Sequence, residues 1–325
     1  MPTPITVLMP APLQESLLGA DVLIQLEKLG PLARYASSDK ITAERAAPLL
    51  RAARIVLNTW GTPRFDAALL AAAPNLELVV YCAGSVKGFV TPELWQRQIR
   101  IASCAHAIGF RVAEYVLGMA IMGLRSGWLF NHVMHTQPQV GSWELKQRYP
   151  DRELFSATVG VVSLGQVGRK VVEALRPHCG RILAFDPFCK PEQAATLGCE
   201  LVDLPTLLRQ CDVLTLHAPK LPETERMIGP AELALLKDGT LLINSSRGSV
   251  IDEAALIAEL RSGRLYAILD VTEPEPPAPD SPLRELPNVM LTPHIAGGQS
   301  RRIGAQALEE VQRFLQGQPL VFEVT

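Results

Sequence analysis

The sequence predicts an α/β protein with two parallel-sheet domains, each Rossmann-like or flavodoxin-like. Short apolar strands alternate with helical stretches in the first hundred residues and again from Thr158 onward. This alternation is typical of parallel sheets whose two faces are covered by helices. The length of 325 residues also exceeds what one ordinary hydrophobic core organises.

The first series is expected to form four strands with helices between them. The strands are expected at residues 5–9, 55–57, 76–81 and 99–103. Helices are expected at residues 23–29 and 67–72. From Val112 the pattern changes to a longer apolar helix at residues 113–124.

The second series is longer and ends in an amphipathic helix. Its strands are expected at residues 159–163, 182–186, 213–216, 240–244, 266–271 and 289–291, with helices such as 167–175 and 253–260. A closing helix at 302–315 has one apolar face, made of Ile303, Ala307, Val311, Phe314 and Leu315. We expect this helix to pack on the first domain. That domain is then discontinuous, residues 1–105 plus 292–325, around a second domain of residues 106–291.

Composition and charge exclude several classes of partner. A net charge of −2 gives no reason to expect nucleic acid or an anionic membrane. The longest apolar run, residues 112–124, is broken by Glu114 and glycines, so no membrane span is expected. Nothing near the amino terminus resembles a secretory signal. The six cysteines lack CxxC spacing, which favours reduced thiols in a cytoplasmic protein.

One histidine pair has a spacing that metal ligands can have on a helix. His132 and His135 could face one side of a helix, but no Cys, Asp or Glu accompanies them at ligand spacing. We therefore expect no metal.

A glycine-rich turn follows the strand at 159–163 and predicts dinucleotide binding. Gly165, Gln166, Val167 and Gly168 open the next helix, where backbone N–H groups and the positive helix end can hold a pyrophosphate. Asp186 ends the following strand, where an acid bonds the ribose 2′-OH and favours NAD over NADP.

The first glycine of the usual G-x-G-x-x-G pattern is replaced by Ser163. A Cβ there is expected to shift the loop or to weaken cofactor binding. The alternative is an ordinary turn between a strand and a helix, with Asp186 as a solvated carboxylate at a strand end.

Three side chains with acid–base or anion-binding chemistry follow later strands. Arg247, Glu275 and His294 each come at or just beyond the end of a strand, where open α/β sheets bind ligands. A guanidinium can grip a carboxylate and polarise a carbonyl, and an imidazole can exchange a hydroxyl proton near neutral pH. Each residue could separately be an ion-pair, loop or capping residue. Together they indicate redox chemistry on a keto acid.

Several segments of the chain resemble the D-isomer-specific 2-hydroxyacid dehydrogenase family. They are Ile-Asn-Ser-Ser-Arg-Gly-Ser-Val-Ile-Asp-Glu at 243–253, Leu-Asp-Val at 269–271 with Glu275-Pro276, Leu-Thr-Pro-His-Ile-Ala-Gly at 291–297, and Leu-His-Ala-Pro at 216–219 with Glu223-Thr224. The resemblance covers nearly the whole chain and is strongest from Thr158 to Gly297.

The resemblance implies a role for each matching residue. Arg247 would bind the substrate carboxylate and carbonyl, His294 would be the acid/base, and Glu275 would support the imidazolium. A loop of the first domain, Gly84, Ser85 and Val86, would offer N–H groups to the substrate carboxylate. The remaining positions would contact NAD: Gly165, Gln166, Val167, Gly168, Asp186, Pro219, Ser245, Ser246, Asp270 and Gly297. The family also implies a homodimer, with the helix at 113–124 near the domain hinge and the dimer interface. From the residues alone, that helix could equally be buried within one domain.

Two departures bear on the substrate. Formate dehydrogenases of the family have Asn where this chain has Ile108, and Gln where it has Glu275, so formate is not expected. Ile108, with His106 and Phe110 nearby, would make the pocket more apolar or bulkier. The expected function is interconversion of a D-2-hydroxy acid and its 2-keto acid with NAD.

Two alternatives remain open. One is a non-catalytic NAD-sensing binding protein, similar to the C-terminal-binding co-repressors of the same fold. The other is a dehydrogenase of another anionic substrate, such as a phosphonate, which the same Arg-based clamp would serve.

Overall fold

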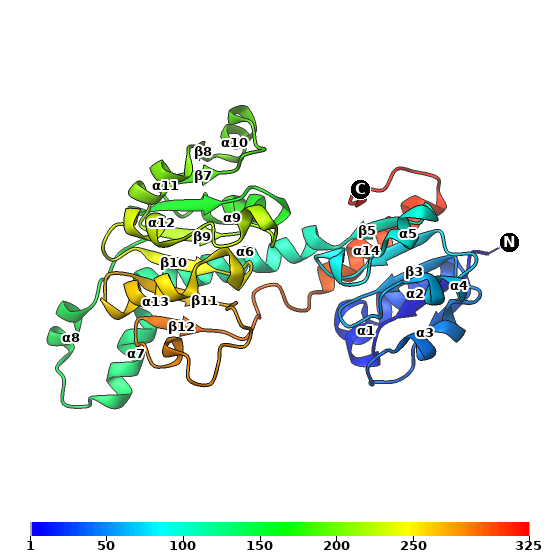
Figure 1. Ribbon diagram of the computed structural model, residues 1–325, viewed down its shortest axis with the longest axis horizontal. Helices are drawn as coiled ribbons and strands as arrows, with labels where there is room; N and C mark the ends of the chain where they lie inside the picture. The colour runs from blue at the N-terminus through cyan, green and yellow to red at the C-terminus, as the bar shows by residue number, and fades with distance from the viewer. Residues whose placement is uncertain (1, 325) are drawn as a thin grey trace. The chain divides into compact units, whose positions relative to one another are not determined.

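The computed structural model describes residues 2–324 and divides into two compact units (Figure 1). Unit 1 comprises the residues up to Ile108 and those from Gln299 onward, and unit 2 comprises Gly109–Gly298. The second boundary falls after Gly298 rather than after residue 291. The segment that carries His294 therefore belongs to unit 2, because it is hydrogen-bonded to the end of a unit 2 strand.

Unit 1 contains a five-stranded parallel sheet in the order β2-β1-β3-β4-β5. This is the flavodoxin-like order. Three of its strands are buried at every position, as expected for parallel strands covered on both faces. The strand bounds are β1 Ile5–Leu8, β2 Leu32–Arg34, β3 Ile55–Asn58, β4 Leu78–Tyr81 and β5 Arg100–Ser103.

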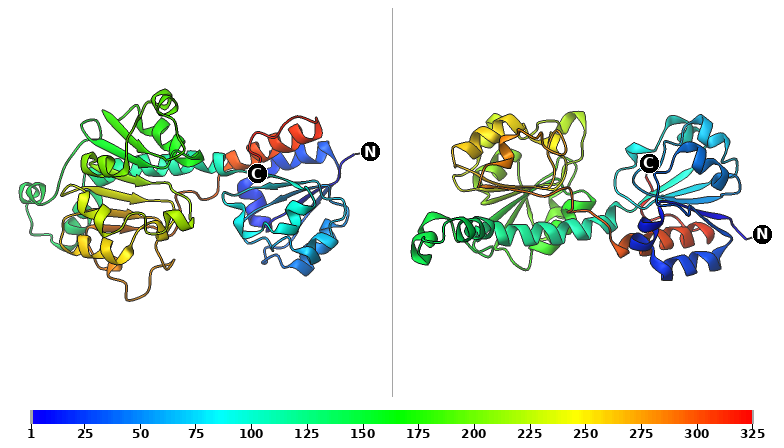
Figure 2. Two further views of the ribbon diagram at one scale, coloured as in Figure 1. Left: turned by 45° about the horizontal axis from the view of Figure 1, so that its top comes forward. Right: turned by 90° about the horizontal axis from the view of Figure 1, so that it is seen from below.

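Helices cover both faces of the unit 1 sheet. The carboxyl-terminal helix α14 packs against α1, α2 and β4, and Figure 2 shows it beside α1 and α2 on one face. Its Ile303, Ala307 and Val311 are fully buried. The helix bounds are α1 Ala11–Leu17, α2 Gly19–Leu29, α3 Ala43–Leu50, α4 Ala67–Ala71, α5 Pro92–Gln96 and α14 Arg301–Leu315, with a 3-10 turn η1 at Val86–Gly88.

Unit 2 contains a seven-stranded parallel sheet in the order β12-β11-β10-β9-β6-β7-β8. This is the doubly wound dinucleotide-binding order with one added strand, and the strand order reverses beside β6. The bounds are β6 Thr158–Val162, β7 Arg181–Phe185, β8 Glu200–Leu201, β9 Val213–Leu216, β10 Leu241–Asn244, β11 Tyr266–Leu269 and β12 Val289–Leu291.

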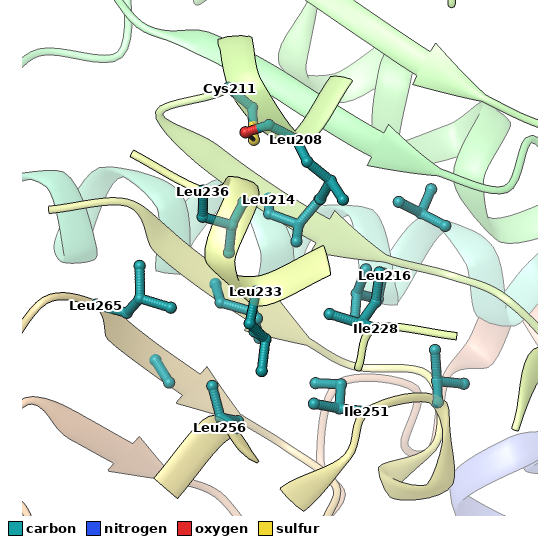
Figure 3. Close-up of a cluster of buried hydrophobic side chains, with 14 of the residues drawn as sticks. Leu208, Cys211, Leu214, Leu216, Ile228, Leu233, Leu236, Ile251, Leu256 and Leu265 are labelled. Carbon is teal, nitrogen blue, oxygen red and sulfur yellow. Dashed lines mark hydrogen bonds between the residues drawn. The ribbon is translucent and has the colours of Figure 1, made fainter. Parts of the chain in front are cut away.

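One hydrophobic core of unit 2 lies between its sheet and the helices α11 to α13. Leu214 and Leu242 from the sheet meet Leu208, Leu233 and other fully buried side chains, several of which are labelled in Figure 3. The helix bounds are α7 Gly127–Thr136, α8 Ser142–Arg148, α9 Gln166–Leu175, α10 Pro191–Leu197, α11 Leu204–Gln210, α12 Pro230–Leu235 and α13 Glu253–Arg261, with 3-10 turns η2 Pro222–Thr224, η3 Gly248–Val250 and η4 Pro282–Arg284.

The opposite face of this sheet is covered by the long helix α6, Ala105–Leu124 (Figure 2). A Cβ on its Gly123 would lie 2.3 Å from a methyl carbon of Leu241, so helix and strand are in close contact. The helix begins eight residues before the predicted segment. By length and composition it could cross a membrane, contrary to the expectation of no such segment. One such helix is weak evidence, because a core helix can pass the same test.

Candidate active site

The glycine-rich turn joins β6 to α9 at the point where the strand order reverses. Ser163 has a φ of 76°, the left-handed conformation that glycine adopts without strain. A Cβ on Gly168 would lie 1.9 Å from the Ser163 carbonyl oxygen, so only glycine allows this approach. The serine thus occupies a glycine-type conformation, and the tight turn is formed at the cost of backbone strain.

The same turn leaves room for a pyrophosphate. Gly165 is the N-cap residue of α9 and has no side chain that could cap the first turn. A Cβ built on it would have only the Ser163 Oγ near it, at 3.9 Å, so the space beside this backbone is open. Gly165 and Gln166 are exposed, whereas Val167 is half-buried. An open cradle at the N-terminus of a ten-residue helix fits the phosphates of a dinucleotide.

Asp186 lies at the carboxyl end of β7 and is tied to the glycine turn. Its Oδ2 accepts a hydrogen bond from the Leu164 N–H at 2.7 Å. Its Oδ1 accepts from the N–H groups of Phe188 and Cys189, at 2.8 and 3.1 Å. The structure therefore places the carboxylate beside the turn, where the ribose of a dinucleotide would lie.

One hydroxyl without a hydrogen-bond partner lies where the family resemblance places the nicotinamide of NAD. Ser245 follows β10, is 9% exposed, and its Oγ is buried without a hydrogen-bond partner among the described residues. The neighbouring Ser246 Oγ donates to Asn244 Oδ1 at 2.9 Å. A buried hydroxyl without a partner is costly, so Ser245 fits a polar group supplied by a cofactor. Pro219 lies exposed after β9.

Arg247 lies in the loop after β10, pressed against the loop that follows β11. A Cβ on the adjacent Gly248 would lie 2.1 Å from the backbone of Thr272, so the two loops touch. Arg247 is half-buried, and its Nη1 donates to the Ser246 carbonyl at 2.5 Å. Thr272 is three residues before Glu275. The packing thus brings the arginine loop against the glutamate loop.

Glu275 and His294 form a hydrogen-bonded pair. The distance from His294 Nδ1 to Glu275 Oε1 is 2.6 Å, and both side chains are about 40% exposed. Because a carboxylate only accepts, Nδ1 carries the proton in this pair and Nε2 is left for a substrate. The pair borders a cavity of about 490 Å³ that also includes Thr272, Arg284 and Pro293.

Asp270 holds the turn that carries His294. It is 1% exposed, and its carboxylate accepts hydrogen bonds from Thr292 Oγ1 at 2.5 Å and from the N–H groups of Ile295 and Ala296, at 2.8 and 2.9 Å. Its carbonyl oxygen accepts from the His294 N–H at 2.9 Å. The family resemblance places the Asp270 carboxylate at the nicotinamide carboxamide. In the structure this carboxylate accepts hydrogen bonds from groups of its own chain. Gly297, half-buried, follows this turn.

Sequence reasoning missed two residues of this network, Tyr115 and Thr292. The Tyr115 hydroxyl lies 2.7 Å from Thr292 Oγ1. Thr292 could have been suspected, because it stands two residues before His294. No local pattern indicates Tyr115, which reaches the site from α6.

The predicted substrate loop lies in unit 1, directly after β4. Ser103 Oγ donates to the Gly84 carbonyl at 2.7 Å, and Ser85 and Val86 lead into η1. A Cβ on Gly84 would lie 3.8 Å from Ile108 Cδ1. Ile108, which stands where formate dehydrogenases of the family have Asn, is therefore next to this loop.

Metal ligands are not gathered in the part of the chain that the structure describes. Residues 2–324 contain no group of three or more His, Cys, Asp or Glu side chains that could hold a metal ion. His132 and His135 lie on α7.

Comparisons with known proteins identify relatives of this chain. Residues 128–296 match the family model described as D-isomer specific 2-hydroxyacid dehydrogenase, NAD binding domain. The chain is 33% identical over 263 residues to a D-3-phosphoglycerate dehydrogenase of Archaeoglobus fulgidus, covering 79% of this chain and 49% of that protein. It is 31% identical over 264 residues to a hydroxypyruvate reductase of Thermotoga maritima, covering 79% and 83%.

A solved structure supports the fold. D-mandelate dehydrogenase of Rhodotorula graminis has a TM-score of 0.84 at 22% identity, with 100% of this chain and 98% of that chain covered. The chain spans about half the length of the phosphoglycerate dehydrogenases that it matches.

Proposed function

Since the chain belongs to the D-isomer-specific 2-hydroxyacid dehydrogenase family, we propose that it interconverts a D-2-hydroxy acid and the matching 2-keto acid with NAD(H). The observation that carries this proposal is the Glu275–His294 pair at 2.6 Å, on the sheet edge that also carries the Arg247 loop. An acid/base and a guanidinium on one sheet edge suit a substrate with a carboxylate beside a carbonyl.

The chain's own residues would bind the substrate and move its proton. Bound NADH supplies the hydride. In the reducing direction, His294 Nε2 donates a proton to the carbonyl oxygen, while Glu275 stabilises the imidazolium through Nδ1. Arg247 holds the substrate carboxylate and offsets negative charge on the carbonyl oxygen. In the oxidising direction, neutral His294 accepts the hydroxyl proton.

The cofactor proposal favours NAD over NADP. The cradle at Gly165, the unpaired Ser245 hydroxyl and the position of Asp186 support a bound dinucleotide. A carboxylate at the ribose accepts from a 2′-OH and repels a 2′-phosphate.

We propose a 2-keto acid, rather than formate, as the substrate. Ile108 beside Gly84 favours a substrate with an apolar side chain, and Glu275 stands where formate dehydrogenases have Gln. The names of the relatives add phosphoglycerate and hydroxypyruvate to the candidates.

A substrate panel tests this function. Oxidation of NADH and of NADPH would be followed by absorbance with 2-keto acids from glyoxylate and hydroxypyruvate to phenylpyruvate. We expect NADH-dependent turnover of one class of acid, with NADPH much poorer. Tight NADH binding without turnover of any acid would contradict the enzyme assignment and favour a sensing role.

We also propose that the chain forms a homodimer through α6, α7 and α8. Ile121, Met134 and Trp143 on these helices are 45%, 60% and 76% exposed. Large apolar side chains exposed on consecutive helices are typical of a protein interface.

A further inference from the structure

Tyr115 contacts the turn that carries His294 although it is far from that turn in the sequence. It lies on α6, half-buried, and its hydroxyl is 2.7 Å from Thr292 Oγ1. Burial raises the pKa of Tyr115 to about 12. The phenol is therefore protonated, and able to donate, at every pH at which an enzyme of this kind would work.

The direction of the hydrogen bonds follows from the chemistry of the three groups. A carboxylate only accepts, so the hydroxyl proton of Thr292 goes to Asp270 Oδ1, at 2.5 Å. The threonine has no second hydroxyl proton, so Tyr115 is the donor in its contact with Thr292. The chain of donors thus runs from Tyr115 through Thr292 to Asp270.

Asp270 in turn fixes the backbone on both sides of His294. Its carboxylate accepts from the N–H groups of Ile295 and Ala296, and its carbonyl oxygen accepts from the N–H of His294. His294 has a φ of 55°, a strained conformation for a residue with a side chain. Such a conformation persists only where surrounding contacts hold it.

We propose that Tyr115 is a positioning residue for His294, acting through Thr292 and Asp270 to hold the imidazole at Glu275. This proposal rests on the proposed function, in which His294 moves the proton. The helix that carries Tyr115 is thereby connected to the acid/base, and the hydroxyl, not the ring, is the part that acts.

Four variants test the hydroxyl relay. Tyr115→Phe keeps the ring and removes one hydrogen bond, so kcat should fall about fivefold while KM for the keto acid stays within about twofold. Thr292→Val, which keeps the shape, removes both bonds and should lower kcat about 30-fold. Thr292→Ser keeps the hydroxyl and should stay within about twofold of the parent chain. Tyr149→Phe, a tyrosine of unit 2 that packs edge-on against Phe130, is the matched control and should change nothing.

A double variant separates positioning from general destabilisation. If Tyr115 acts through Thr292, the Tyr115→Phe change should have no further effect on kcat in the Thr292→Val background. Independent, multiplying effects would contradict the relay. So would equal losses in Thr292→Ser and Thr292→Val, because the hydroxyl would then not matter.

A second readout does not depend on turnover. The hydrogen-bonded Nδ1 proton of His294 should give a downfield NMR resonance that disappears in Glu275→Gln. In Tyr115→Phe and Thr292→Val we expect this resonance to broaden or move upfield, and in Thr292→Ser and Tyr149→Phe to stay. An unchanged resonance in Tyr115→Phe and Thr292→Val overturns the proposal. A shifted resonance in a chain without dehydrogenase activity would uphold the positioning and refute the proposed function alone.

Discussion

Ser163 has its left-handed backbone at the tightest point of the glycine turn, where the Gly168 backbone approaches its carbonyl oxygen. A residue with a Cβ loses about 1–2 kcal/mol in this conformation, and glycine does not. Glycine would therefore stabilise the folded turn relative to serine. Part of this stabilisation is offset because glycine has more conformational freedom than serine in the unfolded chain. The strain is thus a local property of one side chain.

Replacing Ser163 with glycine should therefore stabilise the protein. We expect Ser163→Gly to raise the free energy of unfolding by about 0.5–1 kcal/mol in urea denaturation, because the strain is removed. Ser163→Ala retains a Cβ and should give no such gain. Equal stabilisation by both variants would mean that the serine hydroxyl, not the backbone, is the unfavourable part.

His217 makes stability depend on pH. Burial lowers the pKa of His217 to about 3, whereas an unfolded histidine has a pKa of about 6.5. The unfolded chain therefore binds a proton that the folded chain excludes, and the free energy of unfolding falls as pH falls from about 6.5 towards 3. Above about pH 6.5 this histidine has no effect.

The effect is measurable before most carboxylates titrate. Between about pH 6.5 and 5, His217 should cost about 2 kcal/mol of stability, at about 1.4 kcal/mol per pH unit. In His217→Gln this part of the slope should vanish, and in the exposed control His178→Gln it should remain. An unchanged slope in His217→Gln would show that other groups control acid stability.

The residues of the candidate site that follow the ends of strands could be predicted from the sequence. Arg247, Glu275 and His294 follow parallel strands that the structure places side by side as β10, β11 and β12. The carboxyl ends of parallel strands share one edge, so the sequence could indicate their grouping. Tyr115 could not be predicted, because its contact with Thr292 depends on how α6 packs in unit 2.

At the scale of elements, the β6–turn–α9 segment contains two glycines with different tasks. Gly168 is required by packing, since a Cβ would lie 1.9 Å from a carbonyl oxygen. Gly165 faces open space, and we infer that its missing side chain matters only when a dinucleotide is bound.

Substitution by alanine should therefore affect stability at one glycine and cofactor binding at the other. Gly168→Ala should lower the free energy of unfolding by about 3 kcal/mol, because the turn cannot close. Gly165→Ala should change stability by less than about 0.5 kcal/mol and yet weaken NADH binding at least about tenfold. Urea denaturation and fluorescence titration measure the two quantities. Normal NADH binding by Gly165→Ala would contradict the assignment of the cradle.

Most strands were predictable to within a few residues, but the short edge strands β2 and β8 were not. Val213–Leu216 and Val289–Leu291 have the predicted bounds. The strands β2 and β8, of three and two residues, are only partly buried and have no apolar run that could indicate them. Their pairing with β1 and β7 depends on tertiary contacts rather than on local sequence.

At the scale of the whole molecule, the exposed side chains of α6 to α8 predict the oligomeric state. We expect the chain to elute with the mass of a dimer in size-exclusion chromatography with light scattering. Met134→Lys combined with Trp143→Lys should give a monomer, because charges would be buried in the interface. Phe188→Lys, a 91% exposed side chain after β7, is the control and should leave the dimer intact. A monomeric parent chain would contradict the proposed interface.

Hydrogen bonds determine where the chain leaves unit 2 and returns to unit 1. Residues 292–298 were expected in the first domain, together with the closing helix. Asp270 instead holds this segment on unit 2 through side-chain and backbone bonds. Such a link between segments distant in the chain is invisible to periodicity.

The proposed function depends on His294 as the group that moves the substrate proton in an NAD-dependent dehydrogenase. The most direct measurement compares NADH oxidation by the parent chain and by His294→Ala, at saturating levels of the best 2-keto acid. We expect kcat to fall by about 10²–10⁴ while NADH binding is kept, because only the acid/base is lost. Near-normal turnover by His294→Ala would contradict the claim.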